Sequence, residues 1–135
     1  MPPAAKSALE CRMDYAAAKA YLLSQPEAVE DYPFGIEAAV FKVRNKMFGL
    51  LTQSGAASRI NLKCNPDEAL ALRDIFPAIT PGYHMNKKHW NTVLLDGSVP
   101  NGEIERMIDN SYMLVVQGMP AAKRSLLVHN KKNSA

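Results

Sequence analysis

The sequence has no long apolar run, few aromatic residues and only two cysteines. Apolar stretches such as Met47–Leu51 and Tyr112–Val116 fall far short of the roughly 20 residues that a membrane-spanning helix needs. The first ten residues carry one lysine with no apolar run behind it, so we predict no secretory signal. Cys11 and Cys64 share no metal-binding or redox spacing and suit a reducing compartment. We therefore expect a cytoplasmic protein that does not associate with membranes.

The sequence also lacks the motifs of common enzymes. It has no phosphate-binding loop, dinucleotide fingerprint, His-Glu-x-x-His helix or serine nucleophile elbow. A Cys64 thiolate activated by His84 or His89 is the catalytic alternative, but Cys64 falls on the apolar side of its predicted strand, which favours an inert thiol. We therefore expect no enzymatic activity and no cofactor.

His84 and His89 are also the candidate metal ligands, because they flank the turn Asn86-Lys87-Lys88. A metal site would need a third and a fourth ligand, and the two lysines between the histidines oppose a cation electrostatically. A hairpin with hydrogen-bonding histidines is the favoured interpretation, and we predict no metal.

Length and composition predict one globular domain. With 135 residues, of which 47% are hydrophobic and 21% charged, the chain can bury a single core. We expect this domain over residues 13–125, between a flexible leader at residues 1–12 and a flexible tail at residues 126–135. We expect it to be a monomer.

Three helices are predicted. A helix over 15–23 follows a capping aspartate, and a helix over 66–75 follows an asparagine cap with proline at its first position. A third begins near Pro100, and its apolar residues recur at helical spacing up to a cap at Gly118.

Strands are predicted before and after the second helix. Residues 58–64 are the clearest, because apolar Ile60 and Leu62 alternate with polar neighbours. Asn45 tolerates the left-handed backbone of a tight turn between two earlier strands. Short connections favour an antiparallel sheet with helices on one face, an α+β two-layer domain. The other segments are an irregular stretch at 29–35 and strands at 39–44, 47–51, 80–85 and 89–95.

Most of the aromatic residues considered are predicted to lie in the core. Phe34, Phe41 and Phe48 are predicted to be buried, and Trp90 is predicted to be a core or half-buried anchor rather than a base-stacking platform. Tyr83 follows a Pro-Gly turn, so its hydroxyl can reach either solvent or a ligand.

Charge is segregated along the chain. The net charge is only +3, but residues 38–66 contain five basic residues and no acid, whereas residues 13–37 contain five acids and one lysine. Once folded, such a chain can display a basic surface.

Several distinctive motifs are spread along the chain: Asp31-Tyr32-Pro33-Phe34-Gly35, Lys46-Met47-Phe48, Asn61-Leu62-Lys63-Cys64, the block from Pro81 to Asn91, Leu95-Asp96-Gly97 and Ser111-Tyr112. In this order and at this spacing, they resemble the MmcQ/YjbR family. The resemblance covers about residues 13–124 and implies an α-β(3)-α-β(2)-α fold like that of secretion chaperones, in agreement with the order predicted from local patterns. It also implies DNA binding, since the family looks like a "double wing" protein whose loops grip a duplex.

Two basic clusters are the candidate nucleic-acid contacts, because lysine and arginine reach phosphates and release counterions. Without a recognition helix, zinc finger or RNA-binding aromatic motif, sequence-specific readout of bases is not predicted. Two alternatives stay open: the basic residues are the solvated faces of ordinary strands, or the domain is a chaperone-like module that binds proteins or peptides. The clusters are Lys42, Arg44, Lys46, Arg59 and Lys63 on the first strands, and Lys87, Lys88 and His89 on the later hairpin.

Overall fold

The structure is a computed structural model that describes residues 13–54, 57–82 and 86–120. The predicted leader, the whole of the predicted tail, and Tyr83 and His84 lie outside these ranges. The strands are β1 (Ala28–Asp31), β2 (Ala38–Val43), β3 (Lys46–Ser54), β4 (Ala57–Lys63), β5 (Ile79–Pro81) and β6 (Trp90–Leu94). The helices are α2 (Tyr15–Leu23), α3 (Pro66–Ile75) and α4 (Asn101–Gln117).

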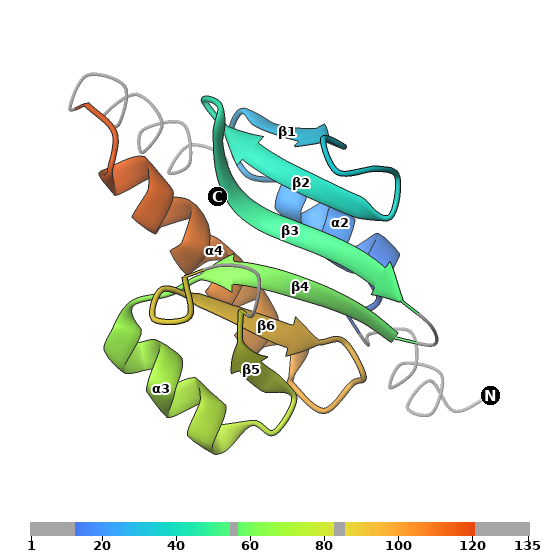
Figure 1. Cartoon of the computed structure of the whole chain (residues 1–135), viewed down its shortest axis with the longest axis vertical. Coiled ribbons are helices and arrows are strands. Elements are labelled where there is room, and N and C mark those ends of the chain that lie inside the picture. Colours follow the sequence, from blue (N-terminus) through green and yellow to red (C-terminus); the bar gives the residue numbers. More distant parts are fainter. Residues whose placement is uncertain (1–12, 55–56, 83–85, 121–135) are drawn as a thin grey trace.

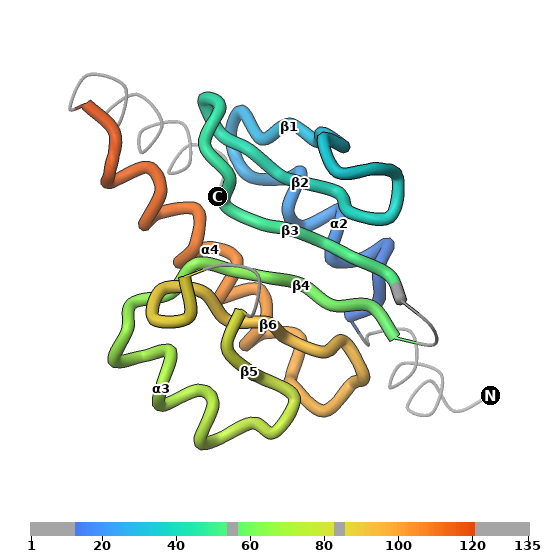
Figure 2. The backbone as a smooth tube through the Cα atoms, in the orientation of Figure 1, coloured from blue at the N-terminus to red at the C-terminus, as the bar shows by residue number. Residues whose placement is uncertain are grey.

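All six strands form one antiparallel sheet in the order β1-β2-β3-β4-β6-β5. Helices α2 and α4 lie behind the sheet in Figure 1, and α3 lies beside its β5 edge. The backbone trace in Figure 2 shows that the front of the sheet carries no helix of the described part. The α+β fold with an antiparallel sheet is thereby confirmed. Within the described residues, no helix has the length and apolar character to cross a membrane.

The helices begin where the sequence predicts. An oxygen of Asp14 accepts a hydrogen bond from the Ala17 amide at 2.8 Å, which caps α2. The Asn65 side chain accepts one from the Asp67 amide at 3.0 Å, and Pro66 opens α3. Helix α4 starts directly after Pro100 and ends at Gly118.

One strand adds to the predicted order. Residues 29–35 are predicted to be irregular, but the first of them belong to β1, which pairs with β2 from Ala28 opposite Val43 to Asp31 opposite Val40. The pairing partner lies far along the chain, so the strand depends on tertiary contact rather than local propensity. Pro33 follows within two residues of the strand's end, and the stretch after it is irregular as predicted.

The hairpin of β2 and β3 turns on Arg44 and Asn45, whose φ angles are 49° and 68°. Two successive left-handed residues give the turn whose twist matches a two-residue hairpin. The prediction for Asn45 is confirmed, and Arg44 shares the left-handed conformation. Farther along, Phe41 lies opposite Gly49 and Lys42 lies opposite Met47, so Phe48 is an extra residue that forms a β-bulge.

Ser111 of α4 stands beside the bulged residue Phe48, where the ladder between β3 and β4 ends at the pair Gly49–Leu62. Its hydroxyl accepts a hydrogen bond from the Lys63 amide at 2.9 Å and donates one to the Phe48 carbonyl at 2.5 Å. Ser111 is fully buried, and its one hydroxyl satisfies two backbone groups; the bond to the Phe48 carbonyl is itself buried. Its neighbour Tyr112 packs edge-on against Phe48, with ring centroids 5.4 Å apart, and donates to the Pro26 carbonyl at 2.8 Å.

The core lies between the sheet and the helices. Ile60 and Leu62 of β4 point into it, as the alternation predicts, and Phe41 and Phe48 are fully buried. Phe34 is different: the prediction that it is buried is wrong, because 75% of it is exposed. It lies in the β1–β2 connection, where residues 32–37 are all exposed and no element covers them.

We predict that Leu62→Asp largely unfolds the protein. Leu62 is 2% exposed, so the change buries an unpaired carboxylate at a cost of about 3 kcal/mol or more, against a total stability of ~5–15 kcal/mol. Urea denaturation followed by circular dichroism measures the loss. Asn61→Asp is the matched control, because it places the same side chain on the other face of β4; similar midpoints for the two variants would contradict the assigned faces.

We predict that Ser111→Ala destabilises the fold by about 1–3 kcal/mol, because it leaves the Lys63 amide and the Phe48 carbonyl unpaired in the interior. The measurement is the same denaturation series. Ser24→Ala is the control, since the Ser24 hydroxyl bonds an exposed helix-end carbonyl at 2.6 Å and its loss should cost much less. A Ser111→Ala midpoint equal to that of the control would show that the bridge does not matter for stability.

Candidate nucleic-acid interface

The front of the sheet displays the polar side of β4. Because Leu62 faces the core, its neighbours Asn61 and Lys63 point the other way, and so does Arg59. The strand register places Lys63 opposite Trp90, and Arg59 opposite Leu94. The predicted faces of this strand are therefore confirmed, and Arg59 and Lys63 lie on the helix-free side.

Two turns lie at one end of this sheet, separated by β3 and β4 (Figure 1). The first basic turn is Arg44-Asn45, directly before Lys46, and the second basic turn is residues 86–89. The pairing of Gly49 with Leu62 and the hydrogen bond of 2.7 Å from the Cys64 amide to the His89 carbonyl fix this arrangement. The structure thus brings most of the first predicted cluster to the end of the sheet that holds the second, whereas Arg59, opposite Thr52 and Leu94, lies toward the other end.

Two of the predicted cations are engaged with carboxylates at the β1 edge. Lys42 Nζ lies 3.1 Å from Asp31, and Arg44 donates to both oxygens of Glu27 at 2.5 and 2.9 Å. The hydrogen bond from Lys42 lowers the pKa of Asp31, and that from Arg44 lowers the pKa of Glu27. These two cations therefore contribute less to a binding surface than the sequence predicts.

Four of the other predicted cations have no such partner in the described part of the chain. Lys46, Arg59, Lys63 and Lys88 form no ion pair with any described carboxylate. Lys46, Arg59, Lys87 and Lys88 are exposed, and Lys63 and His89 are half-buried. Strands β3, β4, β5 and β6 contain no aspartate or glutamate at all. Lys46, Lys63 and Lys88 therefore add positive charge to this end of the sheet, where Glu27 compensates only Arg44.

Arg73 of α3 belongs to the same end, although no sequence pattern points to it. Its Nε donates to Asn91 Oδ1 at 2.7 Å, and its Nη2 donates to the carbonyls of Lys87 and, at 3.4 Å, of Trp90. Asn91 itself is 1% exposed and donates to the Ala69 carbonyl. Basic residues are common near the C-terminal end of a helix, so the sequence does not distinguish Arg73 from others of its kind. Only the folded chain reveals its contact with the turn.

Trp90 is half-buried, one of the two degrees of burial predicted for it, and its role as an anchor stays a prediction. Its backbone carbonyl accepts from the Gly82 amide at 3.0 Å, and a Cβ at Gly82 would meet the Trp90 Cβ at 3.0 Å. The close approach explains a glycine at this position. The alternatives for Tyr83, and a metal site that uses His84, concern residues outside the described ranges; among the described residues no group of three or more His, Cys, Asp or Glu could hold a metal ion.

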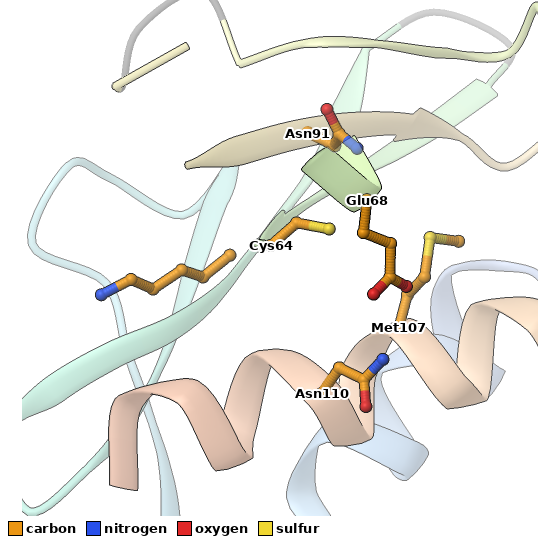
Figure 3. Close-up of a pocket in the computed structure, with 6 residues that line it drawn as sticks. Cys64, Glu68, Asn91, Met107 and Asn110 are labelled. Atoms are coloured by element: carbon orange, nitrogen blue, oxygen red, sulfur yellow. The ribbon is translucent and has the colours of Figure 1, made fainter. Parts of the chain in front are cut away.

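Cys64 lines a small pocket between β4, α3 and α4, where its side chain points toward those of Glu68 and Met107 (Figure 3). It is 7% exposed, and burial, with a smaller contribution from Glu68, raises the pKa of its thiol to about 11. A neighbouring cleft that shares Cys64 and Glu68 has a volume of about 210 Å³, below the ~300–1,000 Å³ of ordinary ligand pockets. A protonated thiol in so small a space supports no catalytic assignment.

The fold is an α+β domain with helices on one face of its sheet and, among the described residues, no helix on the other. A family model described as YjbR matches residues 23–114, and the chain belongs to the YjbR family. The uncharacterized protein YbdF of Escherichia coli O157:H7 is 40% identical over 107 residues, which cover 79% of this chain and 86% of that protein. The uncharacterized protein YjbR of Escherichia coli K12 is 34% identical over 108 residues, which cover 80% and 92%.

Solved structures agree with this assignment. The crystal structure of a Deinococcus radiodurans protein with a DUF419 domain matches with a TM-score of 0.79 and 35% identity, over 86% of this chain and 88% of that one. A crystal structure of a Pseudomonas syringae protein matches with a TM-score of 0.68 and 31% identity, over 76% and 99%. The names of these proteins state no activity, so the function has to be argued from the site.

We predict that Cys64 reacts with thiol reagents at pH 8 at least about 100-fold more slowly than an unstructured cysteine, since a thiol pKa of about 11 leaves very little thiolate. The rate with a disulfide reagent, measured in a Cys11→Ser background, tests this. The rate should still be rising above pH 9. Reaction of Cys64 as fast as that of a model peptide would mean that the site is open and the thiolate accessible.

Proposed function

We propose that this protein binds DNA through phosphate contacts at the basic end of its sheet, with little preference for sequence. The observation that carries the proposal is the placement of Lys46, Lys63 and Lys88 at one end of a sheet whose β3 to β6 strands have no acid. Lysines without a carboxylate partner attract phosphates and release counterions on binding. The family resemblance to a two-winged DNA-binding protein points the same way.

The geometry favours phosphate contacts over base readout. The cations lie on turns and on a sheet face, and α4, which extends past this end of the sheet in Figure 1, carries no lysine or arginine after Arg106 within its range. Contacts of this kind position a protein on nucleic acid without reading its bases. Weak, salt-sensitive binding to many sequences is therefore the expected behaviour.

One observation favours the alternative of a protein-binding module. Val29, Phe34 and Ile36 are 53%, 75% and 87% exposed, and they lie on or next to β1, which is an edge strand of the described sheet. An extended peptide can add to a free strand edge and cover such side chains. Binding of that kind depends little on salt, so the ionic-strength series below separates the two functions.

We predict that affinity for a short DNA duplex falls steeply as salt rises, and that Lys46→Gln with Lys88→Gln flattens this dependence. Each phosphate contact contributes about 0.9 to the slope of log affinity against log salt, so the double variant should lose about 1.8. Fluorescence anisotropy across a salt series, on two unrelated duplex sequences, gives the slopes. Both sequences should be affected equally.

Lys19→Gln with Arg106→Gln is the matched control. It removes the same charge from the helix side of the protein, where Lys19 pairs with Glu30 at 3.0 Å and Arg106 pairs with Glu68 at 2.7 Å. This control should keep the wild-type slope. Absence of wild-type binding at low salt, or equal slopes for the two double variants, would refute DNA binding and favour the protein-binding module.

A further inference from the structure

The second basic turn is held from three directions. Within the turn, the amides of His89 and Trp90 donate to the Asn86 carbonyl at 3.1 and 2.9 Å, and the Lys88 amide donates to the Asn86 side chain at 3.0 Å. From β4, the Cys64 amide donates to the His89 carbonyl at 2.7 Å. From α3, the guanidinium of Arg73 reaches the turn and the first residues of β6. The exposed Lys87 and Lys88 therefore stand on a restrained backbone.

The Arg73 contact is a fork that joins three acceptors. One nitrogen bonds the side chain of the buried Asn91, and another bonds the carbonyl of Lys87 and, more weakly, that of Trp90. A planar guanidinium can serve acceptors on two sides at once, whereas a lysine ammonium is a point charge on a flexible stem. Arginine is thus required here for its shape as much as for its charge.

The charge of Arg73 is not neutralised by this arrangement. Its acceptors are an amide oxygen and two carbonyls, and no carboxylate of the described residues pairs with it. The side chain of Arg73 is half-buried, and the N–H groups that it directs at the turn are bonded to these three acceptors. Arg73 therefore contacts the turn that carries the exposed Lys87 and Lys88, but it is not itself one of the exposed cations.

We infer that Arg73 is a positioning residue that holds the second basic turn so that Lys87 and Lys88 meet DNA phosphates in a fixed geometry. The inference rests on the DNA binding proposed above and assigns to α3 a part in it. A restrained turn loses less conformational freedom on binding than a loose one, so the clamp raises affinity without a DNA contact of its own.

Amide hydrogen exchange tests the clamp without DNA. Arg73→Lys keeps the charge and loses the fork, so the amides of His89 and Trp90 should exchange at least about threefold faster than in the wild type. Arg106→Lys is the matched control, because Arg106 is also forked, onto Glu103 and Glu68, but lies away from the turn. Its exchange at His89 and Trp90 should match the wild type.

A double-mutant cycle tests the role in binding. Arg73→Lys should weaken affinity for a short duplex about threefold to tenfold in the wild-type background, as expected for coupled neighbours. In a Lys87→Gln, Lys88→Gln background the same change should have no effect, because the residues that it positions are gone. If Arg73→Lys does not melt cooperatively near the wild-type temperature, Arg73→Gln, which keeps an amide donor for Asn91, takes its place in both experiments.

The outcomes separate the inference from the proposed function. Faster amide exchange in Arg73→Lys with unchanged affinity for DNA overturns the positioning role. An equal loss of affinity in the wild-type background and in the Lys87→Gln, Lys88→Gln background also overturns it, because it would make Arg73 a direct DNA contact. Unchanged exchange shows that the clamp does not restrain the turn and also overturns the inference. No wild-type binding at low salt overturns the proposed function and the DNA role of Arg73 with it, while the exchange data still decide whether the clamp exists.

Discussion

The hydroxyl of Ser111 determines how one end of the sheet is built. It stands between the Phe48 carbonyl and the Lys63 amide, at a bulge where the strands that carry them do not bond directly. The next residue, Tyr112, packs on Phe48 and bonds the Pro26 carbonyl, so two consecutive residues of α4 fix the helix against three segments of the chain. A buried amide or carbonyl left without a partner is costly, and here one side chain prevents both losses.

The same end of the sheet gathers the cations. Lys46 follows the hairpin turn, Lys63 ends β4 beside the Ser111 bridge, and the turn before β6 brings Lys87 and Lys88. The acids of residues 27–31 lie at the β1 edge and pair there with Lys19, Lys42 and Arg44. Folding therefore separates cations that are paired with acids at the β1 edge from Lys46, Lys63 and Lys88, which have no acidic partner among the described residues, so a net charge of +3 can still produce a basic surface.

Much of this fold can be predicted from the sequence, because the residue patterns that indicate its helices, strands and turns are local. Alternation identifies β4 and its faces, an asparagine followed by proline marks the start of α3, and Asn45 marks the turn between β2 and β3. Family motifs add the order of the elements. Strand β1 and the exposure of Phe34 are not predicted by such local patterns. An edge strand depends on pairing with another strand, which local propensity does not indicate, and an aromatic residue is buried only if another element covers it.

By itself, then, the sequence determined the fold class, the helix starts, the alternating strand and the segregation of charge, because each depends on neighbours within a few residues. Tertiary structure alone decided which cations are paired, since Lys42 meets Asp31 and Arg44 meets Glu27 only when β1 adds to the sheet. It also decided that Arg73 reaches the turn before β6 and that Ser111 bridges two strands. These contacts join residues far apart along the chain, and their geometry exists only after helices and strands have packed.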